Sequence, residues 1–213
     1  MLGIEQPNWD VLLIGGHSTS GKSTVARKLG QHFGVSVSQV DDYRLVLQRA
    51  TSPGQIDGLH FFSQDPAVIF ANPLDSVVEQ LIRIGKIMSD ALEDVIAHHV
   101  ITHTPIILEG DGILPALAIL QEIDGVSVTG KIKSVFIVES SEQAFFQSCR
   151  ERWPGSEADS HTSDWVRLAW RYGQWLCAET QKLGLPIVKS QPWDMLGQRI
   201  LAELSMASGN WIC

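Results

Sequence analysis

The sequence predicts an α/β fold in which helices cover both faces of a parallel sheet, and three observations support this prediction. Five short runs are apolar and β-branched, as the buried strands of a parallel sheet are. Each run is followed by a polar or glycine-rich turn and, sooner or later, by a helical pattern. The length, residues 1–213, favours one domain. The five expected strands are Val11–Ile14, Val35–Val40, Pro105–Leu108, Ile132–Val138 and Pro186–Val188.

Two segments show the apolar spacing of long helices. From Leu74 to about His98 the spacing predicts a helix that packs on the core. From about Asp164 to Leu183 an aromatic stripe includes Trp165 and Tyr172. Because that spacing is typical of a buried face, we expect the stripe to pack in the core rather than to stack bases. Two segments rich in Gly, Pro, Ser and Asp are expected to be loops, namely Thr51–Pro66 and Pro154–Ser163.

The charge and the termini exclude several classes of protein. The 16 Lys and Arg residues against 24 Asp and Glu residues give a net charge of −8, which repels nucleic acid. An acid and a proline precede a first apolar run of only a few residues, so we expect no secretory signal, no membrane span and a cytoplasmic protein. The three cysteines are far apart and are expected to be ordinary reduced thiols. The oligomeric state stays open.

The segment after the first expected strand matches a phosphate-binding pattern. Residues Gly16–Ser23, GHSTSGKS, satisfy G-x-x-x-x-G-K-[ST] and lie between a buried strand and a helix that runs through Val25 and Leu29. Glycines let the backbone fold around an anion, and successive N–H groups at the helix N-terminus point at its oxygens. Lys22 can neutralise phosphate charge and Ser23 can bind Mg²⁺. The pattern therefore predicts a nucleoside triphosphate site, but it does not separate a switch, an ATPase and a kinase.

Acidic residues follow the second and third expected strands. Asp41 and Asp42 end the run QVDD, and Glu109 and Asp111 stand in EGDG. Because ligands of open α/β sheets bind at the carboxyl ends of the strands, these acids are expected beside the phosphates. One acid of the first pair can deprotonate an acceptor hydroxyl, and Glu109 can hold Mg²⁺ or position the acceptor. A helix cap at the first pair and a plain turn around Asp111 are the simpler alternatives.

Two further segments have candidate roles. Arg150 and Arg152 precede the second expected loop, where one of them can close over the phosphates and stabilise transition-state charge. Surface ion pairing is the alternative. Trp193 follows the fifth strand, where a loop against an adenine ring would lie, but a tryptophan that caps the core is the favoured interpretation.

The motifs GGHSTSGKST, VDDYR and ILEGDG, followed by an arginine pair before a loop, resemble in this order the small-molecule P-loop kinases. That group includes shikimate, gluconate, nucleoside and 2-phosphoglycerate kinases and chloramphenicol phosphotransferase. The resemblance implies a P-loop NTPase three-layer sandwich whose five-stranded parallel sheet has the order 2-3-1-4-5. It also implies a helical lid at about 150–165 and an acceptor-binding insertion at about 51–100.

Two branches of that group match different residues. The run Gln39-Val40-Asp41-Asp42-Tyr43, with Glu109-Gly110, resembles uridine and nicotinamide riboside kinases. The spacing Asp41-x-x-Arg44-x-x-Leu47 resembles 2-phosphoglycerate kinases, where Arg44 would bind an anionic acceptor. Residues 65–73 and the Trp-rich helix match neither branch, so the acceptor stays open.

The predicted function is an ATP-dependent kinase that transfers the γ-phosphoryl group to a hydroxyl of a nucleoside, a phosphoglycerate or a similar small molecule, with ATP and Mg²⁺ as cofactors. The alternatives are a nucleotide-dependent switch or ATPase that acts on a protein partner, and an antibiotic phosphotransferase. The expected nucleotide-binding residues are Gly16, His17, Ser18, Thr19, Ser20, Gly21, Lys22, Ser23 and Thr24. The candidates for catalysis are Lys22, Asp41, Asp42, Arg150 and Arg152, those for the acceptor are Arg44, His60, Glu109 and Asp111, and those for the metal are Ser23, Asp41 and Glu109.

Overall fold

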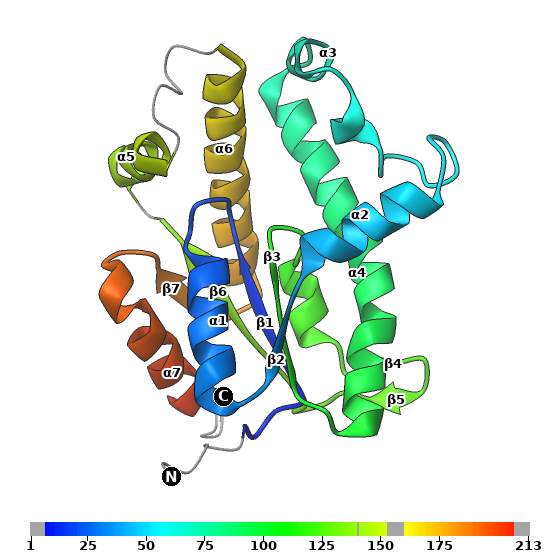
Figure 1. Ribbon diagram of the computed structural model, residues 1–213, viewed down its shortest axis with the longest axis vertical. Helices are drawn as coiled ribbons and strands as arrows, with labels where there is room; N and C mark the ends of the chain where they lie inside the picture. Colours follow the sequence, from blue (N-terminus) through cyan, green and yellow to red (C-terminus); the bar gives the residue numbers. More distant parts are fainter. Residues whose placement is uncertain (1–6, 140, 153–159, 207–213) are drawn as a thin grey trace.

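Five parallel strands form the central sheet (Figure 1). The computed structural model describes residues 7–139, 141–152 and 160–206. The sheet has the order β2-β3-β1-β6-β7, which is 2-3-1-4-5 when its five strands are counted along the chain. The predicted fold class and strand order are therefore confirmed. The strands are β1 (Val11–Gly16), β2 (Ser36–Gln39), β3 (Ile106–Gly110), β6 (Ile132–Val138) and β7 (Ile187–Lys189).

Helices connect these strands and extend beyond them. The described helices are α1 (Lys22–Phe33), α2 (Val40–Ala50), α3 (Pro66–Phe70), α4 (Leu74–Thr102), α5 (Glu142–Arg152), α6 (Ser160–Lys182) and α7 (Leu196–Met206). The short 3₁₀ turns are η1 (Phe61–Ser63), η2 (Pro115–Ile119) and η3 (Trp193–Met195). A separate hairpin joins β4 (Glu122–Ile123) to β5 (Val126–Ser127) through an Asp-Gly turn, the pair that such tight turns favour. No helix of the described ranges is both long enough and apolar enough to cross a membrane.

Different helices cover the two faces of the sheet. Because successive strand residues point to opposite faces, Leu12 and Ile14 of β1 pack in the cluster under α1 and α7. Val11 and Leu13 pack instead in the cluster under α4 and α6. Figure 1 shows the upper ends of α4 and α6 extending past the sheet edge as two separate columns. The two helices therefore project above the carboxyl edge of the sheet.

The strand register brings the acidic segments to the predicted phosphate-binding loop Gly16–Thr24, named the phosphate loop below. Ile14 of β1 pairs with Glu109 of β3, and Gln39 of β2 pairs with the same residue from the other side. The chain leaves β1 into the loop, β2 into α2 with Asp41, and β3 into Asp111 within a few residues of this register. Three segments that are distant in the sequence therefore meet at one edge of the sheet.

Two predicted boundaries need correction. The expected loop Pro154–Ser163 is partly wrong, because α6 begins at Ser160; residues 154–159 lie outside the described residues. Ser, Thr and Asp are frequent in helix starts as well as in loops, so composition alone does not separate the two. The helix expected from Leu74 continues to Thr102 and ends where His103 adopts a left-handed conformation with φ 51°.

Candidate active site

The loop Gly16–Thr24 owes its shape to glycine at two positions. Gly16 has φ 151°, and a Cβ there would lie 2.4 Å from the carbonyl oxygen of Ile137. Gly21 has φ 89°, and a Cβ there would lie 2.6 Å from the ring of Trp193. A side chain would be strained or would collide at either place. The motif glycines are therefore required by this backbone.

The buried ring of His17 holds the loop in place through contacts of both its nitrogens. Its ring is 1% exposed, its Nε2 accepts the Glu139 N–H at 3.1 Å, and its Nδ1 lies 2.7 Å from the Ser18 carbonyl oxygen. This assigns the proton to Nδ1, which donates to that carbonyl. Burial lowers the pKa of His17, which favours the neutral ring. On α6, a Cβ at Gly173 would lie 2.8 Å from the imidazole, so only glycine allows this approach.

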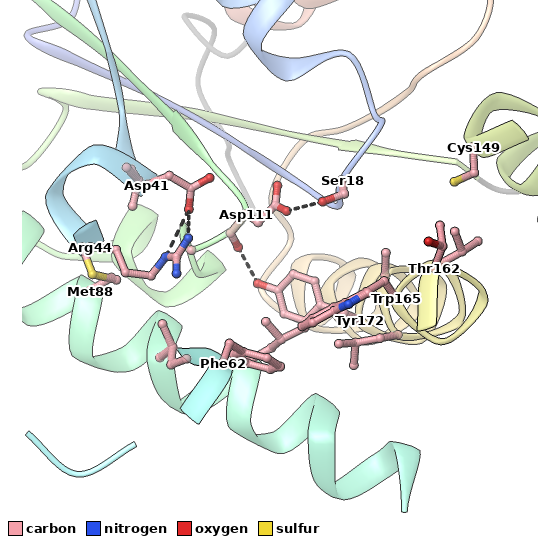
Figure 2. A pocket seen from close by; sticks show the side chains of 17 residues that line it. Ser18, Asp41, Arg44, Phe62, Met88, Asp111, Cys149, Thr162, Trp165 and Tyr172 are labelled. Atoms are coloured by element: carbon pink, nitrogen blue, oxygen red, sulfur yellow. Dashed lines mark hydrogen bonds and ion pairs between the residues drawn. The ribbon is translucent and has the colours of Figure 1, made fainter. Parts of the chain in front are cut away.

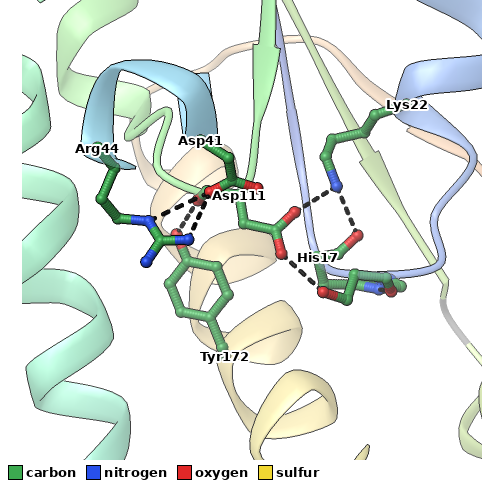
Figure 3. A network of polar contacts seen from close by, with 7 residues as sticks. His17, Lys22, Asp41, Arg44, Asp111 and Tyr172 are labelled. Atoms are coloured by element: carbon green, nitrogen blue, oxygen red, sulfur yellow. Dashed lines mark hydrogen bonds and ion pairs between the residues drawn. The ribbon is translucent and has the colours of Figure 1, made fainter. Parts of the chain in front are cut away.

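Lys22 and Asp111 form the centre of a polar network (Figure 3). The Lys22 ammonium is nearly buried, donates to the His17 carbonyl at 2.9 Å and pairs with the Asp111 carboxylate. The Ser18 hydroxyl donates to the other Asp111 oxygen at 2.7 Å. Burial by itself would raise the pKa of Asp111, but the charge of Lys22 and the hydrogen bonds from Lys22 and Ser18 outweigh it and lower the pKa. Asp111 is therefore an ionised partner for the loop.

Tyr172 of α6 fixes the backbone of that acid. Its hydroxyl donates to the Asp111 carbonyl oxygen at 2.6 Å, and the side chain is buried. Burial, together with the charge of Asp111, raises the pKa of Tyr172 well above its ordinary value. The phenol therefore stays protonated and remains a hydrogen-bond donor, which ties α6 to the carboxyl edge of the sheet.

The residues around the loop fit a bound anion and its metal. The N-cap of α1, Gly21, supplies no side-chain cap, and the Ser20 hydroxyl is buried without a hydrogen-bond partner. The Glu109 carboxyl is 3% exposed and interacts with the Ser23 hydroxyl. Burial raises the pKa of Glu109. Free N–H groups at a helix N-terminus suit phosphate, and a hydroxyl beside a carboxylate suits Mg²⁺ with its waters.

Metal clusters are not a feature of the described ranges. Residues 7–139, 141–152 and 160–206 contain no group of three or more His, Cys, Asp or Glu side chains arranged to hold an ion. Mg²⁺ in phosphoryl-transfer sites usually needs only one or two carboxylates, because substrate phosphates and waters complete its shell. The pair of Ser23 and Glu109 is sufficient for such a site.

Two cavities meet above this network. A cavity of about 280 Å³ lies over the loop and is lined by Lys22, Ser23 and Glu109 among others. A second cavity of about 770 Å³ lies between α4 and α6 (Figure 2). Three residues line both: Ser18, Asp41 and Asp111. A group bound in the large cavity therefore reaches the phosphate loop at these side chains.

The acids at the start of α2 have different positions. Asp41 lines both cavities and accepts hydrogen bonds from Arg44 Nε at 3.3 Å and Nη2 at 3.2 Å. Asp42 is exposed and lines neither cavity. Arg44 lines the large cavity. His60 lies 3.1 Å from the Thr51 hydroxyl and lines neither.

The two candidate arginines of α5 also differ. Arg152 lines the loop cavity and a third cavity of about 480 Å³ beside it, whereas Arg150 lines neither of these. Trp193 lines the same third cavity and is 41% exposed, so the expectation that it caps the core is wrong. The ring lies against Gly21 because η3 follows β7 directly, at the edge where the loop lies. Residues 153–159 of the predicted lid lie outside the described residues.

The aromatic stripe of α6 is only partly core. Leu168, Tyr172 and Leu176 are buried as expected. Trp165 is 36% exposed and lines the large cavity, so the expectation of core packing is wrong for this residue. The N-terminal end of α6 extends past the sheet in Figure 1. Its residues Trp165, Val166 and Ala169 line the large cavity there. Helical periodicity shows that a face is covered but does not show whether side chains or a ligand cover it.

Comparisons with known proteins identify the fold. No protein-family model matches the chain, and no curated protein matches its sequence. A crystal structure from Chloroflexus aurantiacus j-10-fl, of a protein provisionally described as a kinase, has 14% identity and a TM-score of 0.50 over 98% of this chain and 100% of that one. A gluconokinase from Sinorhizobium meliloti 1021 has 14% identity and a TM-score of 0.48 over 95% of each chain. Deoxyadenosine kinase from M. mycoides has 13% identity and a TM-score of 0.47 over 92% and 99%. The chain therefore has the overall fold of the Chloroflexus structure, and its own parallel sheet has the order 2-3-1-4-5.

Proposed function

We propose that this protein is a kinase that transfers the γ-phosphoryl group of ATP to a hydroxyl of a small molecule, acting as a single domain over residues 1–213. One observation carries the proposal: the phosphate-loop cavity and a larger cavity share the side chains of Ser18, Asp41 and Asp111. Phosphoryl transfer needs donor and acceptor on opposite sides of such a junction, and catalysis is mostly positioning and charge stabilisation.

The loop residues Gly16 to Thr24 hold the phosphates in this proposal. The N–H groups at the start of α1 supply donors, and Lys22 supplies positive charge. ATP supplies the phosphoryl group. Ser23 and Glu109 would hold Mg²⁺, which would supply positive charge to neutralise the phosphates. Lys22 and Ser18 both line the loop cavity. When phosphate oxygens are present there, the two side chains can donate to these oxygens in place of the Asp111 carboxylate.

Asp41 is the proposed base for the acceptor hydroxyl. It lines both cavities, so it can accept a proton from a hydroxyl that faces the loop. Arg44 holds the carboxylate through two N–H donors, which fixes its orientation. Asp42 has no such access, so Asp41 is the better candidate of the adjacent pair.

Arg152 and Trp193 are the proposed contacts on the nucleoside side. Both line the third cavity next to Thr19 and Gly21 of the loop. A guanidinium and an indole that line the same cavity suit a flat base by cation–π and stacking interactions. Arg152 also lines the loop cavity, from which it can stabilise charge on the transferring phosphoryl group.

A switch or ATPase that acts on a protein partner is the competing function. It needs a nucleotide site but no second, mostly apolar cavity joined to the phosphates. The large cavity between α4 and α6 therefore supports the kinase, since a small-molecule acceptor accounts for it. An antibiotic phosphotransferase is a kinase of the same kind with a different acceptor.

The test is an acceptor screen that measures ADP release with Mg²⁺-ATP. Nucleosides, sugar acids, phosphoglycerates, shikimate and hydroxylated antibiotics serve as acceptors. Asp41→Asn is expected to lower turnover by about 10²–10⁴-fold, because a general base contributes that much. Asp42→Asn, its matched neighbour, is expected to change turnover by less than about threefold. Rapid ATP hydrolysis that ignores every acceptor and responds to a protein would contradict the kinase function.

A further inference from the structure

We propose that the acceptor is an uncharged alcohol with an aromatic or alicyclic body, which lies with its hydroxyl at Asp41 and Asp111 and its body against Trp165. This inference rests on the kinase function and names the substrate class for the same site. The large cavity holds about 770 Å³, within the range of about 300–1,000 Å³ that small-molecule sites usually have. Its size therefore suits a compact metabolite rather than a polymer.

The walls of this cavity are polar at one end and apolar along the rest. The polar end, where Ser18, Asp41 and Asp111 lie, adjoins the phosphate loop. The apolar wall comes from α4 and α6 and includes Leu81, Ile84, Met88, Val166, Leu168 and Ala169. An acceptor with one hydroxylated end and one apolar end matches this gradient, because each end then meets groups of its own kind.

The charges of the cavity disfavour an anionic acceptor. Among the described lining residues the charged side chains are Asp41, Asp111 and Arg44, so their formal sum is 1 − 2 = −1. Arg44 already donates twice to Asp41, and Lys22 pairs with Asp111 from the loop side. A phosphate or carboxylate on the acceptor would need to compete for these pairs in a largely apolar space, where an unmatched charge is costly. These ion pairs argue against the prediction that Arg44 binds an anionic acceptor.

The outer end of the cavity is aromatic. The Trp165 ring lies 5.6 Å from the Phe62 ring at 48° and 4.9 Å from the Phe70 ring at 85°. These contacts join α6 to the segment 61–70, which belongs to the predicted acceptor-binding insertion. Trp165 lines the cavity, as Figure 2 shows, and is 36% exposed. A ring that its neighbours hold at a cavity wall is a platform for a flat or cyclic body.

Binding by matched probes tests the charge preference. Chloramphenicol and uridine are the uncharged probes, and 2-phosphoglycerate and uridine 5′-monophosphate are the anionic ones; affinities come from calorimetry and ring contacts from saturation-transfer NMR. The uncharged probes are expected to bind at least about tenfold more tightly, the factor that one well-made contact provides. Equal or tighter binding of the anionic probes would overturn the proposal.

Variants of the walls test the placement. Trp165→Ala is expected to weaken the uncharged probes about tenfold, whereas Trp165→Phe keeps a ring and most of the affinity. Ile101→Ala, at an exposed site near the far end of α4, is the control and should leave affinity unchanged. Leu81→Lys adds a cation to a partly exposed wall position and should strengthen the anionic probes at the expense of the uncharged ones. Unchanged affinity in Trp165→Ala would overturn the placement.

Phosphoryl transfer to the same probes separates this inference from the kinase function. Selective binding of the uncharged probes, with no transfer to any acceptor in the wider screen, would overturn the kinase function and leave the cavity preference intact. Transfer to anionic acceptors alone would overturn the preference and leave the kinase function intact. Transfer to uncharged alcohols that Trp165→Ala impairs mainly through KM would support both.

Discussion

The two ends of the active-site region are built in different ways. The end proposed to bind phosphate, called the phosphate end, consists of backbone and short polar side chains from one loop and two strand ends, held by the pair of Lys22 and Asp111. The end proposed to bind the acceptor, called the acceptor end, is lined mainly by apolar side chains from α4, α6 and η1, which lie far apart along the chain. In the proposed kinase the phosphate end determines only that a phosphate is held. The acceptor end would determine which molecule receives it, since one fold and one phosphate loop are compatible with many acceptors.

The strongest way to separate the two ends is to remove the charge of the loop. Lys22→Met is expected to lower turnover on the acceptor found in the screen by about 10²–10³-fold or more, because Lys22 stabilises the charge of the transferring group. Binding of chloramphenicol or uridine to the large cavity should change by less than about twofold, since Lys22 does not line it. Steady-state kinetics and calorimetry on the same variant give both values.

Lys86→Met provides the control for this substitution. Lys86 is exposed on α4 and lines neither the loop cavity nor the large cavity, so turnover and binding should both stay as in the natural protein. If Lys22→Met lost acceptor binding as strongly as turnover, the two ends would be one cooperative unit and the comparison would be wrong.

That the residues of the phosphate end lie together could be predicted from the sequence, because its signals are local. Gly16, Gly21, Lys22 and Ser23 stand within one short segment that follows a strand, and the parallel sheet brings Glu109 to the same edge. The strand order follows from the resemblance and is confirmed. Which of the adjacent acids faces the cavities depends on the rotation of α2, and no local pattern records that angle.

The acceptor end could not be predicted, for a physical reason. Phe62, Met88 and Trp165 come from three elements, and each is apolar in a segment where an apolar residue normally means core. The spacing of apolar residues along a helix is the same whether that face packs against a strand or lines a cavity. The support of His17 by Gly173 is also invisible in the sequence, because 156 positions separate the two residues (173 − 17). A glycine inside a Trp-rich helix was the one available signal.

That glycine offers a test of intermediate size. Gly173→Ala would place a Cβ 2.8 Å from the His17 ring and displace the residue that supports the loop. Replacing a helical glycine by alanine normally stabilises a helix by up to about 1 kcal/mol, so a loss of about 1–3 kcal/mol would reverse the usual sign. ATP affinity should fall with it, because His17 holds Ser18 and Glu139 in place. Chemical denaturation and calorimetry measure the two effects.

The matched control is Gly197→Ala on α7. A Cβ there would lie 3.8 Å from Val25, an ordinary contact, so this variant should be as stable as the natural protein or more so. Equal stability of the two variants would show that the approach of α6 to His17 does not constrain the loop. Loss of stability without any loss of ATP affinity would show that His17 is structural only.

The smallest expected effect concerns the buried acid of β3. Burial raises the folded-state pKa of Glu109, so its contribution to stability is fully present below the ordinary pKa and is lost as the pH rises through the folded value. Glu109→Gln has the same shape without the titration. The difference in Tm, variant minus natural protein, should therefore become more positive between pH 4 and pH 8. It should rise by about 2–4 °C for each kcal/mol of unfolding free energy that the natural protein loses. Asp111, whose pKa is lowered, is present in both proteins and cancels in the difference.

Scanning calorimetry without nucleotide or Mg²⁺ measures this difference, with Glu122→Gln at an exposed position of β4 as the matched control. A flat or falling curve for Glu109→Gln would mean that Ser23 and Lys22 fully offset the burial of the carboxyl. A rising curve, together with lost phosphoryl transfer in the same variant, would show that the fold maintains an unfavourable buried acid at the phosphate end. In the proposed kinase such an acid has a use, because Glu109 beside Ser23 would hold the metal of a bound triphosphate.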